Sequence, residues 1–270
     1  APGGRLDRAL EGRELQHLER YALPEFLARQ RWFAGKGGAI RIRGVTPFGS
    51  IPGQPNQLAL LEAEGGDDQR YFMPLSVLWG EDNLRFGAPK LSYTLAKVRY
   101  GPTLGALIDA SYDERFVRDL VDAMRRGGEA PAQGGALRFH ATDALRSIDL
   151  SGEIRGVGAE QSNVSLIIGD AAMLKIYRRL RRGDQPEIEV ARFLTEVAGF
   201  QNTPAFYGSA EYVPAEGEPM AFAAAFAFVR NQGDAWGVIL EALDRNLDEF
   251  ALLPHEENGA PPSTFAYPLD

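Results

Sequence analysis

The sequence contains no cysteine, three histidines and only four lysines. Without cysteine the chain has no disulfide, no thiol nucleophile and no thiolate metal site, which fits a reducing compartment. The histidines, His17, His140 and His255, are far apart in the sequence, so we expect no histidine-rich metal cluster. Because arginine is the usual basic residue of this chain, we ask of each lysine what an arginine could not do in its place.

Long apolar runs and an excess of positive charge are lacking as well. The longest apolar run, 220–229, is too short to span a bilayer, and the N-terminal residues lack the apolar core of a signal peptide. The formal net charge of -8 and the pI of about 5.1 argue against a surface that binds nucleic acid or anionic lipid. We therefore expect a cytoplasmic protein with no nucleic-acid or membrane partner.

What the sequence does contain is enough apolar residues for a sizeable core. With 270 residues and 44% hydrophobic composition, one large domain or two subdomains are possible. In the first third, helical periodicity at 6–21 and after Pro24 is followed by strand-like runs between Gly-rich and Pro-rich turns. These runs are 40–48, 57–63 and 70–79. They predict a small antiparallel sheet with helices.

The remainder reads as a helix, a second set of strands and further helices. Apolar residues at helical spacing predict a helix over 103–126, and a strand follows at 136–141. Gly169 and Asp170 offer a tight turn between two strands of a hairpin. The further elements that we expect are strands at 154–159, 164–168, 172–177 and 220–229 and helices at 185–198 and 236–246. The whole pattern predicts an α+β fold.

Lys175 lies near the end of one of these strands, at a place where a kinase needs a lysine. In the small lobe of a kinase, a hairpin covers the nucleotide phosphates, the third strand carries a lysine, and a glutamate from the next helix holds it. A compact ammonium suits that role better than a planar guanidinium. Small polar residues at 161–163 replace a Gly-rich loop, and their side chains and backbone N–H groups can bind phosphate. The alternative reading is a lysine exposed to solvent at a strand edge.

The partner of Lys175 stays open on these grounds. Glu187, Glu189 and Glu196 all lie on the predicted helix. If Val190 and Val197 belong to its core face, Glu189 lies on one flank of that face and Glu187 on the other. Helical geometry therefore does not choose between them.

Two longer stretches make the pattern specific. The segments LPEFLARQRWFAGKG, at 23–37, and GAEQSNVSLIIGDAAMLKIYRRLRRGDQPEIEVARFLTE, at 158–196, resemble the maltokinase family. This includes the maltokinase part of trehalose synthase–maltokinase fusion proteins. The family is similar to aminoglycoside phosphotransferases, with a bilobal, protein-kinase-like fold and an added N-terminal cap. The resemblance implies a cap at 1–100, a kinase-like N-lobe at 101–230, and at 231–270 the exit from the hinge and the start of a C-lobe that is largely absent.

The resemblance also implies which residues bind the cofactor. Lys175 would contact the ATP phosphates and Glu189 would be its partner. The remaining positions match the phosphate loop and the hinge beside adenine, and they are Ser162, Asn163, Ser165, Phe228, Val229 and Arg230. The family's His-Gly-Asp catalytic loop and Asp-Phe-Glu metal-binding segment do not occur in these 270 residues. We therefore expect no catalytic residue and no metal ligand here, and we expect the Mg²⁺ ligands in the C-lobe.

The function that this resemblance implies is that of the N-terminal part of an ATP-dependent maltokinase. The intact enzyme would convert ATP and maltose to ADP and maltose 1-phosphate in α-glucan and trehalose metabolism, fused to or bound by trehalose synthase in some cases. This chain alone would be inactive. One alternative is a non-catalytic cap or assembly module that docks to trehalose synthase. Another is the N-lobe of a related small-molecule kinase with a different acceptor.

Overall fold

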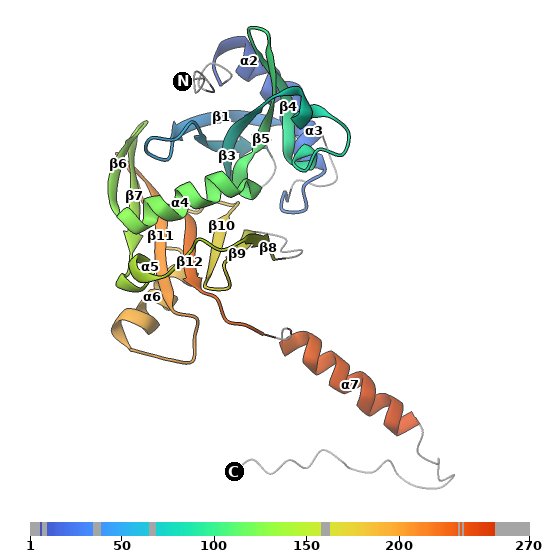
Figure 1. Ribbon diagram of the computed structural model, residues 1–270, viewed down its shortest axis with the longest axis vertical. Coiled ribbons are helices and arrows are strands. Elements are labelled where there is room, and N and C mark those ends of the chain that lie inside the picture. Colours follow the sequence, from blue (N-terminus) through green and yellow to red (C-terminus); the bar gives the residue numbers. More distant parts are fainter. Residues whose placement is uncertain are drawn as a thin grey trace. The chain divides into compact units, whose positions relative to one another are not determined.

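The computed structural model describes residues 6, 10–34, 39–64, 69–157, 163–231, 233 and 235–251. The chain forms two compact units, Ala1–Val229 and Arg230–Asp270. Within the described ranges, every helix is too short or too polar to cross a membrane. All the described strands lie in the first unit, and Figure 1 shows β1, β3, β4 and β5 above the helix α4, and β9, β10, β11 and β12 below it.

The first sheet is antiparallel and has five strands in the order β1-β2-β3-β5-β4. Their bounds are β1 Ile42–Gly49, β2 Gln57–Ala63, β3 Arg70–Trp79, β4 Thr94–Tyr100 and β5 Thr103–Asp109. The predicted strands at 40–48, 57–63 and 70–79 are confirmed. The expected start of a helix at residue 103 is wrong, because 103–109 pairs with β3 and β4 as a central strand.

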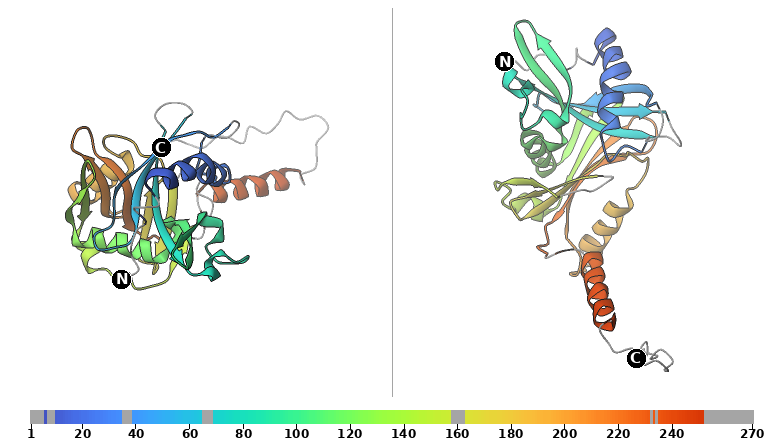
Figure 2. Two further views of the ribbon diagram at one scale, coloured as in Figure 1. Left: turned by 90° about the horizontal axis from the view of Figure 1, so that it is seen from above. Right: turned by 90° about the vertical axis from the view of Figure 1, so that its right-hand side faces the viewer.

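Short helices cover one face of this sheet, as the left view of Figure 2 shows from above. They follow one another as α2 (Gly12–His17), a π-helical turn η1 (Leu18–Ala22) and α3 (Leu23–Ala28). Pro24 lies in the first turn of α3, directly after the π-helical turn. Phe26 and Leu27 are fully buried in a core with Leu61 and Tyr71 of the sheet. This amphipathic packing fixes α3 and the residues that follow it.

The second sheet is antiparallel and has seven strands in the order β6-β7-β11-β12-β10-β9-β8. Their bounds are β6 Gly128–Ala132, β7 Gly135–Ala141, β8 Ile154–Gly156, β9 Asn163–Ile168, β10 Ala172–Tyr177, β11 Phe206–Pro214 and β12 Met220–Ala227. Gly169 and Asp170 both have a φ of 55°, which suits the tight turn expected between β9 and β10. The strand pairs β9–β10 and β10–β12 place Lys175 inside the sheet and not at its edge.

Helices lie on both faces of the second sheet. On one face α4 (Glu114–Arg126) buries Phe116, Val117 and Leu120 in a core shared with the first sheet. On the other face lie α6 (Pro186–Arg192) and its π-helical continuation η5 (Phe193–Val197), which together occupy the predicted helix at 185–198. The other short elements are α5 Asp143–Ser147, η2 Glu81–Leu84, η3 Leu91–Tyr93 and η4 Ala110–Tyr112. The predicted α+β fold, a cap with an antiparallel sheet and helices followed by a second antiparallel sheet with one key helix, is confirmed.

The second unit contains one described helix, α7 (Ala235–Ala251), where a helix at 236–246 was expected.

Candidate functional site

The elements around Lys175 follow the chain order expected from the sequence, with a lysine on the third strand and a helix after it. Along the chain the elements are β8, β9, β10, α6, β11 and β12, and in the sheet the strands lie in the order β11-β12-β10-β9-β8. The third strand, β10, carries Lys175, and the next element, α6, carries acidic residues in its first turn. A lysine on the third strand and an acid on the following helix form the ion pair of a kinase small lobe.

Lys175 is held by Glu187. The Lys175 Nζ donates to Glu187 Oε1 at 2.5 Å, and the Tyr177 hydroxyl donates to Glu187 Oε2 at 3.0 Å. Lys175 and Tyr177 are two residues apart on one strand, so their side chains lie on the same face of the sheet. The ammonium also lies 5.8 Å from the centre of the Phe226 ring. Both oxygens of one carboxylate are thus used to orient the lysine strand.

The environment of Tyr177 keeps its hydroxyl a hydrogen-bond donor. Burial raises the pKa of Tyr177 well above its usual value, and the neighbouring Glu187 carboxylate raises that pKa further. The phenol therefore keeps its proton throughout the physiological range. Sequence reasoning missed Tyr177, although its position two residues after Lys175 was a signal that could have found it.

The expected partner, Glu189, is wrong for this ion pair. The helix face toward the sheet is formed by Ile188, which is 7% exposed, and by Ala191. Val190 and Val197, which the sequence reading placed in the core, are 55% and 72% exposed. Ile188 and Val190 are two residues apart, which corresponds to about 200° around a helix. The face that packs on the sheet is therefore almost opposite to the expected one. Glu189 is exposed, and Glu187 lies beside β10.

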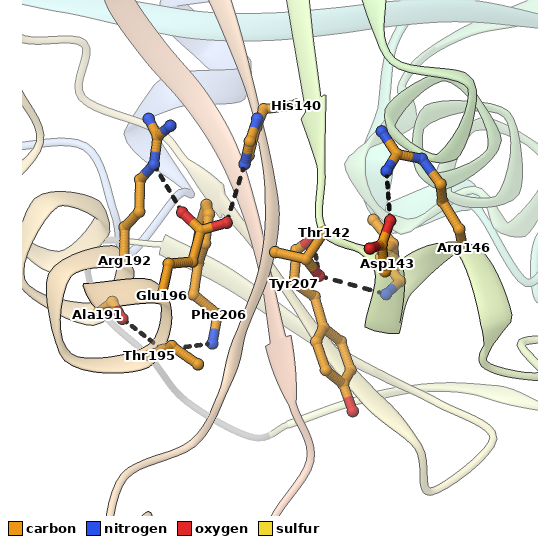
Figure 3. A network of polar contacts seen from close by, with 11 residues as sticks. His140, Thr142, Asp143, Arg146, Ala191, Arg192, Thr195, Glu196, Phe206 and Tyr207 are labelled. Carbon is orange, nitrogen blue, oxygen red and sulfur yellow. Dashed lines mark hydrogen bonds and ion pairs between the residues drawn. The ribbon is translucent and has the colours of Figure 1, made fainter. Parts of the chain in front are cut away.

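The far end of the same helix is fixed to the sheet by a polar network (Figure 3). Glu196 accepts from Arg192 Nε at 2.8 Å and lies 3.7 Å from His140 Nε2 of β7. The Thr195 hydroxyl accepts from the Phe206 N–H at 3.1 Å and donates to the Ala191 carbonyl. Contacts to β7 and β11 therefore hold the helix in place and set the position of Glu187 in its first turn.

The expected phosphate-loop residues are only partly described. Ser162 lies outside the described residues. Asn163 begins β9 and is half-buried, and Ser165 is 2% exposed. In the strand register Ser165 lies opposite Lys175, and Asn163 lies opposite Tyr177. The structure thus brings Asn163, Ser165 and Lys175 together on neighbouring strands.

The expected hinge residues follow β12. The Phe228 N–H donates to the Ala171 carbonyl at 3.1 Å, and the Arg155 guanidinium lies 5.8 Å from the Phe228 ring centre. Val229 is 54% exposed and is the last residue of the first compact unit, whereas Arg230 is the first residue of the second. Among the described residues, no three His, Asp or Glu side chains gather into a set that could ligate a metal ion.

A comparison with known protein families identifies the first sheet and its flanking helix. Residues 26–113 match the family described as maltokinase N-terminal cap domain. The match confirms the resemblance to the maltokinase family over these residues.

Solved structures of glucosamine kinase are similar to a larger part of the chain. One is a complex with glucosamine, ADP and inorganic phosphate, at 19% sequence identity and a TM-score of 0.44. A second crystal form has 18% identity and the same TM-score. Both matches take in 84% of this chain, but they cover only 45% and 46% of the kinase chains. The chain therefore spans less than half the length of these structures.

The N-terminal part that matches this cap family is joined directly to the strand that carries the lysine. Arg178, the residue after β10, is fully buried, and its guanidinium donates twice to Asp109 of the cap, at 3.1 and 2.5 Å. The Trp32 ring of the cap lies 4.7 Å from the same guanidinium. The Phe72 N–H donates to the Arg178 carbonyl at 2.7 Å.

Proposed function

We propose that this chain is the N-terminal, nucleotide-binding part of an ATP-dependent maltokinase. The intact enzyme transfers a phosphoryl group from ATP to the anomeric hydroxyl of maltose and so forms maltose 1-phosphate and ADP. The observation that carries the proposal is the Lys175–Glu187 ion pair on β10 and α6, in a chain that also contains a maltokinase cap. It is further proposed that the enzyme is cytoplasmic, acts in α-glucan metabolism and can occur fused or bound to trehalose synthase.

In this proposal different residues bind different parts of ATP. Lys175 contacts the phosphates with a compact ammonium, and Glu187 orients that ammonium. Ser162, Asn163 and Ser165, with the backbone N–H groups around them, bind phosphate oxygens. Phe228 to Arg230 lie beside the adenine. The donor set fits a nucleotide, because phosphoryl transfer depends on positioning and on neutralising phosphate charge.

The catalytic aspartate and the Mg²⁺ ligands belong, in this proposal, to a further part of the intact protein. None of the three histidines of this chain is followed by Gly-Asp. A purified chain of these 270 residues should therefore form no maltose 1-phosphate from maltose and Mg-ATP. Its formation, even in a single slow turnover measured by mass spectrometry, would contradict this assignment.

The role of Lys175 is tested in the intact enzyme by steady-state kinetics with maltose and Mg-ATP. Lys175→Met should lower kcat/KM for ATP by about 100-fold or more, because phosphate charge is then left without a positioned cation. Glu187→Gln should also lower kcat/KM, because a neutral amide holds the ammonium less firmly. Glu189→Gln is the matched control, since it changes the same chemical group on the exposed side of the helix and should leave kcat/KM near normal. Near-normal turnover of Lys175→Met would return this lysine to a purely structural role.

A further inference from the structure

A cavity of about 550 Å³ lies between the cap and the β8–β9 hairpin. Its walls come from the segment after α3, from residues 89–93 and from the two strands of the hairpin, which lies below the cap in Figure 1. Gly156, Asn163 and Ser165 line it from the hairpin. Lys175, Glu187 and Phe228 are not among its described lining residues. The cavity therefore shares one wall, Asn163 and Ser165, with the site that we propose for ATP, whereas its walls from the cap are separate from that site.

The lining of this cavity is basic in a protein that is acidic. Arg29, Arg31 and Lys90 line it, against Glu114 as the one acid among the described lining residues. Lys90 is half-buried, and its ammonium donates to the Tyr112 carbonyl. Within the described residues no carboxylate lies in ion-pair distance of Lys90 or Arg31, whereas Arg29 lies 4.0 Å from Glu25. A half-buried ammonium with donors to spare and no counter-charge favours an anionic ligand.

Aromatic and amide side chains form the rest of the wall. The rings of Tyr93 and Tyr112 stack with their centres 4.4 Å apart, and Trp32 lines the same space. Aromatic faces pack well against the C–H face of a sugar ring, whereas the Gln30 amide can exchange hydrogen bonds with hydroxyl groups. A few polar groups among aromatic walls, in a volume of this size, are typical of small-ligand sites.

We propose that this cavity is a binding site for a phosphorylated sugar. Lys90 and Arg31 bind the phosphate, and the tyrosine pair and Trp32 hold the sugar ring. This site goes beyond the proposed kinase function, because its ligand does not take part in phosphoryl transfer there. It also stands without that function, since none of its argument rests on the Lys175–Glu187 pair.

The site is tested by isothermal titration calorimetry on the chain with four probes: glucose 1-phosphate, maltose 1-phosphate, inorganic phosphate and maltose. At least one sugar phosphate should bind more tightly, by about tenfold or more, than inorganic phosphate or the unphosphorylated sugar. Saturation with ATP should leave this binding in place. Equal binding of inorganic phosphate, or no binding of either sugar phosphate, would overturn the proposal. Competition by ATP would overturn it as well, because the cavity would then belong to the nucleotide site.

Charge-removing variants locate the site. Lys90→Met and Arg31→Gln should each weaken binding of the sugar phosphate by about tenfold, the usual effect of losing one charge-assisted hydrogen bond. Arg99→Gln is the matched control, because it removes one charge from an exposed arginine elsewhere on the cap sheet. Arg31 is exposed, so Arg31→Gln tests the site even if Lys90→Met fails to fold. Equal binding by Arg31→Gln and Arg99→Gln would place the ligand elsewhere.

Discussion

Tyr177 supports the proposed role of Lys175, which lies two residues earlier on the same strand. Its hydroxyl holds the second oxygen of Glu187, so the carboxylate cannot rotate away from Lys175 without breaking a hydrogen bond. In the intact enzyme Tyr177→Phe should raise KM for ATP roughly two- to tenfold, the range expected for one hydrogen bond, and should change kcat little. The control is Tyr207→Phe, which removes a partly buried hydroxyl from β11. If the two variants had the same KM, Tyr177 would serve packing alone.

Glu211 is a glutamate of β11 whose ionisation is disfavoured in the folded protein. Burial raises the pKa of Glu211 in spite of the nearby positive charges of Arg138 and Arg192, and the Asp184 carboxylate raises it further. Arg138 lies opposite Glu211 in the strand register, but its Nε already donates to Glu129 at 2.9 Å. The desolvation of the Glu211 carboxylate is therefore only partly offset.

The raised pKa of Glu211 makes stability depend on pH in a defined direction. Between the unfolded and the folded pKa the folded state binds more protons, so the free energy of unfolding falls as pH rises through this window. Glu211→Gln should therefore be more stable than the original chain at pH 7, and this advantage should vanish near pH 4. Urea unfolding at both pH values measures the difference, with the exposed Glu216→Gln as control. An advantage of the same size at both pH values would exclude a titration effect.

At the scale of elements, strand positions were readable from the sequence and helix orientation was not. Strands β2, β3 and β10 begin and end at the expected residues, because turn-forming clusters flank short apolar runs. The stretch 103–109 was read as helix because Leu104, Leu107 and Ile108 lie at three- to four-residue spacing. In a central strand, burial on both faces removes the alternation that would have distinguished it. β4, β6 and β11 were missed, and β6 and β11 have few β-branched residues.

The predicted orientation of α6 was wrong for a related reason. Its sequence offers two apolar faces, one with Ile188 and Ala191 and one with Val190, Phe193 and Val197. The second is more hydrophobic, so periodicity selects it as the core face, yet the structure leaves these side chains more than half exposed. The choice depends on contacts with β10, β11 and β12 that lie far away in the sequence. That choice decided between Glu189 and Glu187.

The orientation of this helix can be tested by its effect on stability. Ile188→Ala should lower the free energy of unfolding by about 2 kcal/mol or more, because a buried side chain leaves a cavity. Phe193→Ser, on the outward face of the same helix, should change it by only about 0.5 kcal/mol. Urea unfolding of both variants gives the comparison. A larger loss for Phe193→Ser than for Ile188→Ala would mean that the helix packs with its other face inward.

At the scale of the whole first unit, the two sheets share one core and one buried ion pair. Phe48 and Phe72 of the cap sheet pack against Phe222 of the second sheet, with ring centres 6.3 and 4.8 Å apart. Arg178 and Asp109 cross the same boundary, with exposures of 0% and 1%. Hydrophobic contact is not directional, so it alone would allow several relative orientations of the two sheets. The paired hydrogen bonds add direction, because a guanidinium and a carboxylate meet in one plane.

This ion pair should be costly to break and much less costly to replace. Arg178→Met leaves the Asp109 carboxylate buried without its guanidinium partner, with the Ser111 N–H still donating to it, so the free energy of unfolding should fall by about 3–5 kcal/mol. Adding Asp109→Asn removes the unpaired charge but keeps an acceptor for Ser111. The double variant should therefore be more stable than Arg178→Met alone, although Asp109→Asn by itself is destabilising. Urea unfolding of the four proteins closes a double-mutant cycle, and simple additivity of the two losses would show that the pair does not couple the cap to the lysine strand.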